Sequence, residues 1–262
     1  MSDPSATVSP EAAEFYRQAM TSLREHEVPF LVGGAYALAR YTGITRHTKD
    51  MDLFLIRSDL DRAFAALADS ASTASLDAEH WLGKVKRGDL SIDLIFATGN
   101  GVSQVDQGWF ERSVTDDVFD VAAKLCSAED MLWTKAFVQE RERYDGADVA
   151  HLILRADLNW DVLMQHFAPH WRVLLAHLVY FGFSYPSERK RIPAAVMQEL
   201  IKRLENEERN PAPAARICNG TLLSRAQYLP DVHEWGFADG RLEPEIRLTA
   251  DQVAAWTDAI ER

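Results

Sequence analysis

Two aspartates at the start of a short apolar segment have a spacing that suits metal chemistry. Asp50 and Asp52 stand two apart where the segment 51–56 begins. In a strand, residues two apart share a face, so their α-carbons lie roughly 6.5–7 Å apart on one side. Carboxylates this close repel each other unless a positive group lies between them, and oxygen ligands suit magnesium or manganese. The pair therefore predicts a site for a divalent cation.

A third aspartate lies in a later apolar segment. Asp93 is the only charged residue within 90–97, and a carboxylate among strand hydrophobics is costly unless it is paired or bound to metal. Segments 80–86 and 90–97, separated by Arg87-Gly88-Asp89, predict a hairpin. If the strand of Asp93 lies beside that of Asp52, three carboxylates converge, and such a set could hold two metal ions.

A glycine pair adds a candidate phosphate site. The apolar run 28–32 ends in Gly33-Gly34, directly before the helix-forming residues 35–41. Glycines at this position let backbone N–H groups at the start of a helix approach a phosphate. No Walker-type lysine follows, so the segment is not a P-loop. Taken alone, a glycine pair or an Asp-x-Asp is more often a turn, and the combination with Asp93 carries the functional interpretation.

The elements that position these residues indicate an α/β (α+β) fold. Periodicity predicts strands and helices in alternation up to the hairpin, and mainly helices after it. We expect a disordered tail over 1–10, a mixed-sheet domain flanked by helices over 11–125 and a helical domain over 126–262. The expected strands are 28–32, 51–56, 80–86 and 90–97, and the expected helices are 10–26, 35–41, 59–70, 128–144, 147–156, 160–181 interrupted at Pro169, 193–208 and 248–260.

The order of these motifs resembles that of the DNA polymerase β-like nucleotidyltransferase superfamily. A glycine pair, a helix, Asp-x-Asp on a strand and an aspartate on a later strand occur in that order over 28–97. The stretch TRHTKD at 45–50, followed by MDL, is similar to small antibiotic-modifying and toxin-type members. The resemblance implies that Gly33 and Gly34 contact a triphosphate, that Asp50, Asp52 and Asp93 bind metal, and that Asp93 is also the general base.

A second stretch is similar, in order but not in spacing, to a segment of abortive-infection type nucleotidyltransferase toxins. It contains Lys135, Arg141, Arg143, Asp145 and Asp148. The resemblance implies that Lys135 holds the triphosphate. Two other interpretations stay open: Lys135 is a solvated lysine paired with a nearby glutamate, and Asp145 and Asp148 cap the start of a helix.

Other polar side chains have weaker signals. Arg46 and His47 are candidates for phosphate contact, and a place in a surface loop explains them equally well. His166 and His170 have the i, i+4 spacing of a helical metal site. Pro169 lies between them and their neighbours are aromatic, so we expect them to serve packing.

Composition limits the partners. The net charge of −12 disfavours duplex nucleic acid as the main ligand, whereas metal ions and local basic residues still allow a triphosphate. No apolar run approaches the roughly 20 residues that span a bilayer. The segment MSDPSATVSP lacks the basic start and apolar stretch of a signal peptide, so we expect a cytoplasmic protein without a membrane partner.

These observations predict a metal-dependent nucleotidyltransferase with Mg²⁺ or Mn²⁺ as cofactor. It would transfer a nucleoside monophosphate from a nucleoside triphosphate, such as ATP, to an acceptor and release pyrophosphate. The acceptor stays open among a small molecule, a tRNA end and a protein. The alternative is a non-catalytic binding or regulatory protein of the same fold. If Asp93 acts in catalysis, we expect Asp93→Asn to reduce turnover while stability holds or rises, because the carboxylates repel one another.

Overall fold

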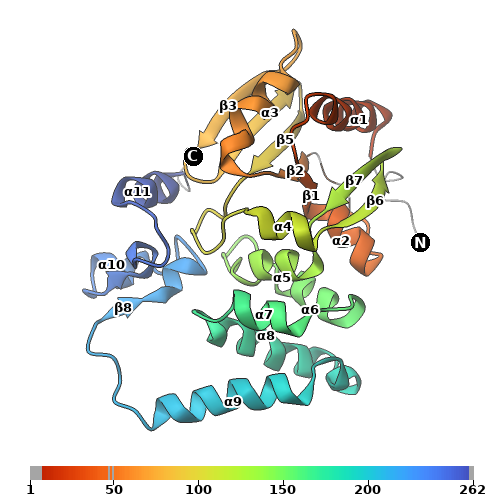
Figure 1. The fold of residues 1–262 in the computed structure, drawn as a ribbon. Coiled ribbons are helices and arrows are strands. Elements are labelled where there is room, and N and C mark those ends of the chain that lie inside the picture. Colours follow the sequence, from red (N-terminus) through yellow and green to blue (C-terminus); the bar gives the residue numbers. More distant parts are fainter. Residues whose placement is uncertain (1–7, 47, 49, 260–262) are drawn as a thin grey trace. The chain divides into compact units, whose positions relative to one another are not determined.

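A computed structural model describes residues 8–46, 48 and 50–259 of the chain, drawn as a ribbon in Figure 1. The chain divides into two compact units, which are described separately. Unit 1 comprises residues 1–131 and 248–262, and unit 2 comprises residues 132–247. The segment 248–262, which the sequence assigns to the helical part, thus belongs to unit 1. Of the predicted tail, residues 1–7 lie outside the described residues, and Pro10 already begins a helix.

Unit 1 is built on a mixed sheet in which the described residues form seven strands, in the order β3-β4-β5-β2-β1-β7-β6. The pairs β2–β5 and β1–β7 are parallel, and the other neighbours are antiparallel. This arrangement confirms the predicted mixed α/β class. The strands are β1 (Leu31–Val32), β2 (Asp50–Phe54), β3 (Thr73–Ala78), β4 (Leu82–Arg87), β5 (Leu90–Ile95), β6 (Val114–Val118) and β7 (Val121–Leu125).

Three of these strands are absent from the sequence prediction, for identifiable physical reasons. The edge strand β3 is exposed along nearly its whole length, so its sequence has no apolar alternation to detect. At the other edge, β6 carries Thr115, Asp116 and Asp117 in its centre. Its partner β7 does alternate between buried and exposed residues, but the alternation covers only five positions. Two of its buried residues, Val121 and Ala123, are also small.

Helices cover the sheet and supply much of its core. Along α1 the predicted apolar stripe is buried, and Ser9 caps the helix by accepting a hydrogen bond from the N–H of Ala12 at 3.2 Å. α1 and α3 lie side by side (Figure 1), with α1 also contacting β7 and α3 contacting β4. The helices of unit 1 are α1 (Pro10–Glu25), α2 (Gly34–Thr42), the 3-10 helix η2 (Arg57–Asp59), α3 (Leu60–Leu67), α4 (Gln107–Arg112) and α11 (Ala250–Asp258), and the unit boundary falls within α5 (Ala128–Ala136).

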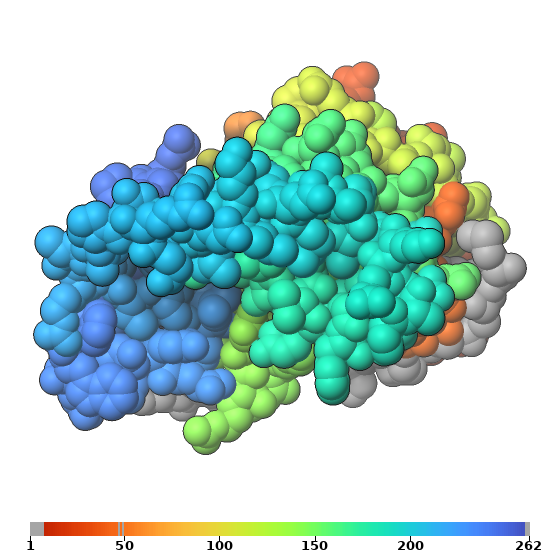
Figure 2. Space-filling view, turned by 90° about the horizontal axis from the view of Figure 1, so that it is seen from below, coloured from red at the N-terminus to blue at the C-terminus, as the bar shows by residue number. Residues whose placement is uncertain are grey.

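Unit 2 is mainly helical. In Figure 2 the atoms of residues 171–208, coloured teal to light blue, form one continuous stretch of the visible surface. The predicted interruption near Pro169 is confirmed, because one helix ends at His166 and the next begins at Trp171. The elements are α6 (Gly146–Arg155), α7 (Trp160–His166), α8 (Trp171–Ser184), η3 (Pro186–Arg191), α9 (Ala194–Glu208), β8 (Ile217–Cys218), η4 (Asn219–Leu222), α10 (Leu229–His233), β9 (Ala238–Asp239) and η5 (Gly240–Leu242).

The single helix expected over 128–144 is wrong. α5 ends at Ala136, and the following residues turn back so that the N–H of Asp145 donates to the carbonyl of Val138 at 3.0 Å. Within the described part of the chain, no helix is long and apolar enough to cross a membrane.

Candidate active site

Asp52 and Asp93 lie side by side on neighbouring strands. β2 and β5 pair in parallel, in a register that makes these two residues Cα partners. Paired residues on adjacent strands point to the same face and are separated by about 4.8 Å. The prediction that their strands are neighbours is therefore confirmed. Met51 and Leu53, which alternate with Asp50 and Asp52, are fully buried on the opposite face.

A lysine continues this row on the far side of Asp93. β4 pairs antiparallel with β5, and Lys84 is the Cα partner of Asp93. Its Nζ lies 2.7 Å and 2.9 Å from the two carboxylate oxygens of Asp93. The side chains are 22% and 13% exposed, so the ion pair is largely shielded from solvent. Lys84, Asp93 and Asp52 thus form one row across three adjacent strands.

Lys84 is a site residue that the sequence motifs miss, although the hairpin carries a signal for it. The sequence predicts the turn at Arg87-Gly88-Asp89; in the structure it comprises only Gly88 and Asp89, and Arg87 is the strand partner of Leu90. Counting back three residues on one strand and forward three on the other places Lys84 opposite Asp93. Register follows from turn length in a hairpin, so a two-residue turn gives this pairing, whereas the predicted three-residue turn would place Lys84 opposite Ile92.

The carboxylate of Asp52 leaves no room for a side chain at residue 34, which is Gly34. A Cβ at this position would lie 1.7 Å from Asp52 Oδ2, and Gly34 has φ +53°, in the left-handed region. The preceding Gly33 is the N-cap of α2 and offers no side-chain cap, and its N–H donates to the carbonyl of Asp52 at 2.9 Å. The first N–H groups of a helix have no partner within the helix and carry partial positive charge. The glycines thus bring the start of α2 against the acidic row.

Burial raises the pKa of the Asp93 carboxyl, and the negative charges of Asp50 and Asp77 raise it further. The hydrogen bond and charge of Lys84 act in the opposite direction. Asp93 therefore combines a shielded environment with a fixed cationic neighbour, which is a common setting for a group that exchanges protons.

The three aspartates act electrostatically on one buried group. Burial raises the pKa of the Tyr16 hydroxyl to about 12, and the charges of Asp50, Asp52 and Asp93 add to that effect. The side chain of Tyr16 is fully buried. The charges of all three aspartates thus act on the same hydroxyl.

The oxygen donors of this region fit a hard divalent cation. Asp50 is exposed, and the carboxylate of Asp52 rests against Gly34, where only a glycine leaves it room. Oxygen ligands are those that magnesium and manganese prefer, and a triphosphate would supply more of them. Over residues 8–46, 48 and 50–259, no three His, Cys, Asp or Glu side chains are gathered closely enough to form a complete metal site.

Arg46 and His47 are the other predicted phosphate contacts. Arg46 is exposed in the segment between α2 and β2. His47 lies outside the described residues. A role for Arg46 in nucleotide binding stays a prediction.

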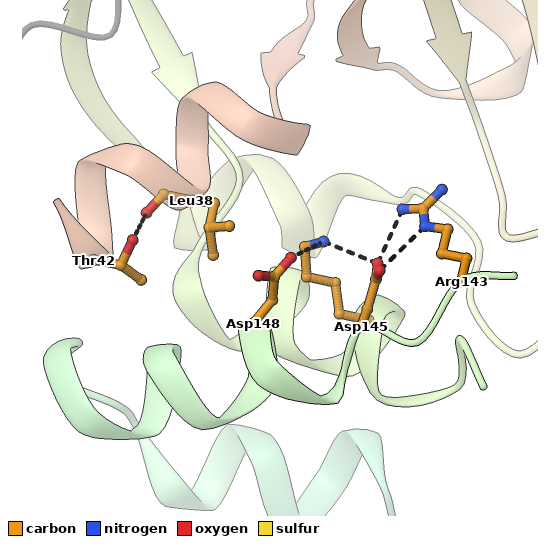
Figure 3. A network of polar contacts seen from close by, with 6 residues as sticks. Leu38, Thr42, Arg143, Asp145 and Asp148 are labelled. Carbon is orange, nitrogen blue, oxygen red and sulfur yellow. Dashed lines mark hydrogen bonds and ion pairs between the residues drawn. The ribbon is translucent and has the colours of Figure 1, made fainter. Parts of the chain in front are cut away.

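The second motif forms a compact ion-pair network within unit 2 (Figure 3). Lys135 Nζ lies 3.0 Å from Asp145 Oδ2 and 2.8 Å from Asp148 Oδ2. Arg143 donates to both carboxylate oxygens of Asp145, at 3.1 Å and 2.9 Å. Asp145 stands at the N-cap of α6 but makes no side-chain capping bond. Lys135, Arg143, Asp145 and Asp148 thus come together, with aspartates rather than a glutamate as the partners of Lys135, whereas Arg141 is exposed.

No family model and no curated protein matches the chain. Among solved structures, the antibiotic-resistance factor ANT(2'')-Ia in solution is 14% identical over 75% of this chain and 95% of its own, with a TM-score of 0.40. The lincosamide antibiotic adenylyltransferase LnuA bound to lincomycin is 15% identical over 56% and 97%, with a TM-score of 0.40.

An antigenic nucleotidyltransferase-like protein from Paracoccidioides brasiliensis is 15% identical over 70% of this chain and 93% of its own, with a TM-score of 0.46.

Proposed function

We propose that this chain is a nucleotidyltransferase that uses a divalent cation, Mg²⁺ or Mn²⁺, to transfer a nucleoside monophosphate from a nucleoside triphosphate to an acceptor. The observation that supports the proposal is the placement of Asp52 beside Asp93 in the sheet, with the carboxylate of Asp52 against Gly34. A turn or cap would explain each residue alone. It does not explain why two carboxylates lie on one face of two parallel strands, next to the start of a helix that begins with a glycine pair.

Each part of the row has a role in this proposal. Asp50 and Asp52 hold the cation, which when bound supplies positive charge to the triphosphate oxygens. The N–H groups at the start of α2, beside Gly33 and Gly34, orient the phosphates. Arg46 is a further candidate for contact with the nucleotide.

The reaction is an in-line displacement at the α-phosphorus. A bond forms between the acceptor oxygen or nitrogen and the α-phosphorus, while the bond to the bridging oxygen of the β-phosphate breaks. Pyrophosphate leaves with the electron pair of that bond. Asp93 takes the proton of the acceptor, a role that suits a carboxyl whose pKa burial raises. Positioning and charge neutralisation supply most of the catalysis in such a reaction.

The test is transfer of label from nucleoside triphosphates that carry ³²P at the α-phosphate. Each of the four ribonucleotides is incubated with the protein, Mg²⁺ and a cell extract, and the extract is separated into small molecules, RNA and protein. We expect one fraction to become labelled, and EDTA to abolish the labelling. The labelled fraction identifies the class of acceptor.

The matched pair of variants is Asp52→Asn and Asp89→Asn. Both remove one aspartate charge from unit 1, but Asp89 is exposed in the hairpin turn, away from the row. We expect Asp52→Asn to lose labelling and Asp89→Asn to retain it. Nucleotide binding without transfer by the wild type, for every nucleotide and fraction, would favour the non-catalytic alternative.

A further inference from the structure

We infer that Lys84 takes the place of a second divalent cation at Asp93, so that the site binds one such ion, on Asp50 and Asp52. This inference rests on the proposed function and concerns the metal content of the same site. Three converging carboxylates suggest two ions, whereas the position of Lys84 favours one ion and one ammonium group.

Both oxygens of Asp93 are already paired with a cation. Lys84 Nζ lies within 2.9 Å of each, so the ammonium bridges the carboxylate. A metal ion that used the same oxygens would come within about 4 Å of the ammonium, where the divalent cation and the ammonium repel each other, more strongly near a protein than in water. Binding there requires Lys84 to leave.

Lys84 is held where it is by the sheet. β4 is an interior strand between β3 and β5, and Val85 beside Lys84 is buried. The register fixes the α-carbon of Lys84 directly opposite that of Asp93. With both side chains largely shielded, moving the ammonium away leaves a carboxylate in a poorly solvated position. The lysine is thus a built-in part of the row.

The charges of the row and of Asp50 together also balance with one ion. Three carboxylates and one ammonium leave two negative charges, which a single divalent cation neutralises. In this arrangement Lys84 fixes the position of Asp93. Because Asp93 binds no metal ion, its carboxylate can face the acceptor. Lys84 is a positioning residue in this proposal, because it acts on the reaction through Asp93.

The experiment counts the ions. Equilibrium dialysis measures Mn²⁺ bound per chain with saturating α,β-methylene ATP, or the same analogue of whichever nucleotide the transfer assay selects. We expect one Mn²⁺ per chain in the wild type, and still one in Asp93→Asn, because Asp93 is not a ligand. In Lys84→Met, which uncovers both oxygens of Asp93, we expect a second Mn²⁺ to bind at least tenfold more tightly than any second ion in the wild type.

Lys86→Met is the matched control, because Lys86 lies two residues along the same strand, is exposed and is paired in register with Ser91 instead of an acid. It should bind one Mn²⁺. Two Mn²⁺ per wild-type chain, with one lost in Asp93→Asn, would overturn the inference and leave the proposed function intact. A single Mn²⁺ in folded Lys84→Met would also overturn it. Absence of any Mn²⁺ or nucleotide binding in the wild type would overturn both. The wild-type and Asp93→Asn counts decide the matter even if Lys84→Met does not fold.

Discussion

Replacing Gly34 with alanine should damage cation binding far more than it damages folding. The added Cβ would lie 1.7 Å from Asp52 Oδ2 and 2.7 Å from Asp52 Cγ, well inside van der Waals contact. The carboxylate is at the end of a short side chain, so it can rotate away while the strand stays in place. We therefore expect Gly34→Ala to displace the ligand oxygens of Asp52.

The cost to stability has two parts. A residue with a Cβ in the left-handed region costs roughly 1–2 kcal/mol, and the loss of unfolded-state freedom on Gly→Ala returns about 0.4–1 kcal/mol. Turning Asp52 out of its rotamer adds on the order of 1 kcal/mol. The total of about 2 kcal/mol corresponds to a fall in Tm of roughly 4–8 °C at a shift of 2–4 °C per kcal/mol for a chain of this size. Displacing groups that support a metal typically weakens its binding about 10–100-fold, and we expect at least the lower figure here.

Gly43→Ala is the matched control. Gly43 caps the other end of the same helix with φ +75°, and nothing lies within 4 Å of the position of its Cβ. Both variants carry the left-handed cost, but only Gly34→Ala meets Asp52. The assay is calorimetric titration of Mn²⁺ into protein saturated with α,β-methylene ATP, together with thermal unfolding of both variants.

The two measurements separate the explanations. We expect both variants to melt below the wild type and only Gly34→Ala to lose Mn²⁺ affinity. If Gly34→Ala binds Mn²⁺ as tightly as the wild type, the carboxylate of Asp52 is not a ligand and the proposed site is wrong. Equal loss of affinity in Gly43→Ala would attribute the effect to the helix rather than to Asp52.

The remaining predictions concern structural parts of the chain. Lys135→Met removes the ammonium between the buried carboxylates of Asp145 and Asp148. Because breaking a buried ion pair is costly, the variant should lose roughly 3 kcal/mol of unfolding free energy. A loss below about 1 kcal/mol in urea titration would contradict this structural role. Although burial opposes it, hydrogen bonds and charges of cationic neighbours lower the pKa of Asp145, so its stabilising contribution is present above the unfolded pKa of about 3.9 and is lost as pH falls through the lower folded value. Between pH 5 and pH 3 the urea midpoint of Asp145→Asn should therefore fall less than that of the wild type, and an equal fall would refute this linkage. Gly99→Ala places a Cβ 2.8 Å from the indole of Trp256 and should loosen α11, seen as faster proteolysis of that helix; unchanged proteolysis would exclude close packing there.

The parts of the fold that the sequence predicts are those with strong local patterns. The strands of Asp52 and Asp93 follow from two apolar runs, and their pairing follows from the order of the motifs. The break near Pro169 follows from the missing N–H of proline. The sequence does not predict edge strands such as β3, because a strand exposed on both faces has no apolar periodicity.

The end of α5 shows how tertiary contacts override local propensity. Residues 137–144 include Val-Gln-Glu-Arg-Glu-Arg, which are ordinary helix formers, and a helix is a reasonable local prediction. The chain instead turns after Ala136, and Asp145 reaches Lys135 and Arg143. Only the three-dimensional arrangement reveals that these charges are one another's partners.

The ion pair of Lys84 changes how an Asp93 variant must be interpreted. From sequence alone, Asp93→Asn is expected to be neutral or stabilising, because it relieves repulsion among carboxylates. In the structure Asp93 has a shielded ammonium partner, so the variant leaves Lys84 without its carboxylate and should lower Tm as well as transfer. A lower Tm of Asp93→Asn is therefore expected whether Asp93 acts in catalysis or only stabilises the sheet.

A double-mutant cycle resolves this ambiguity. Lys84→Met with Asp93→Asn removes both charges, so part of the lost stability should return, and the coupling between two such residues is on the order of 0.5–3 kcal/mol. Transfer should stay at least ~100-fold below the wild type, because a thioether cannot serve as a base and the introduced amide cannot accept the proton. The readouts are Tm and ³²P transfer for the wild type, both single variants and the double variant. Recovery of transfer together with stability would show that Asp93 acts only by holding the sheet, and the chemistry would then have to be assigned to other residues.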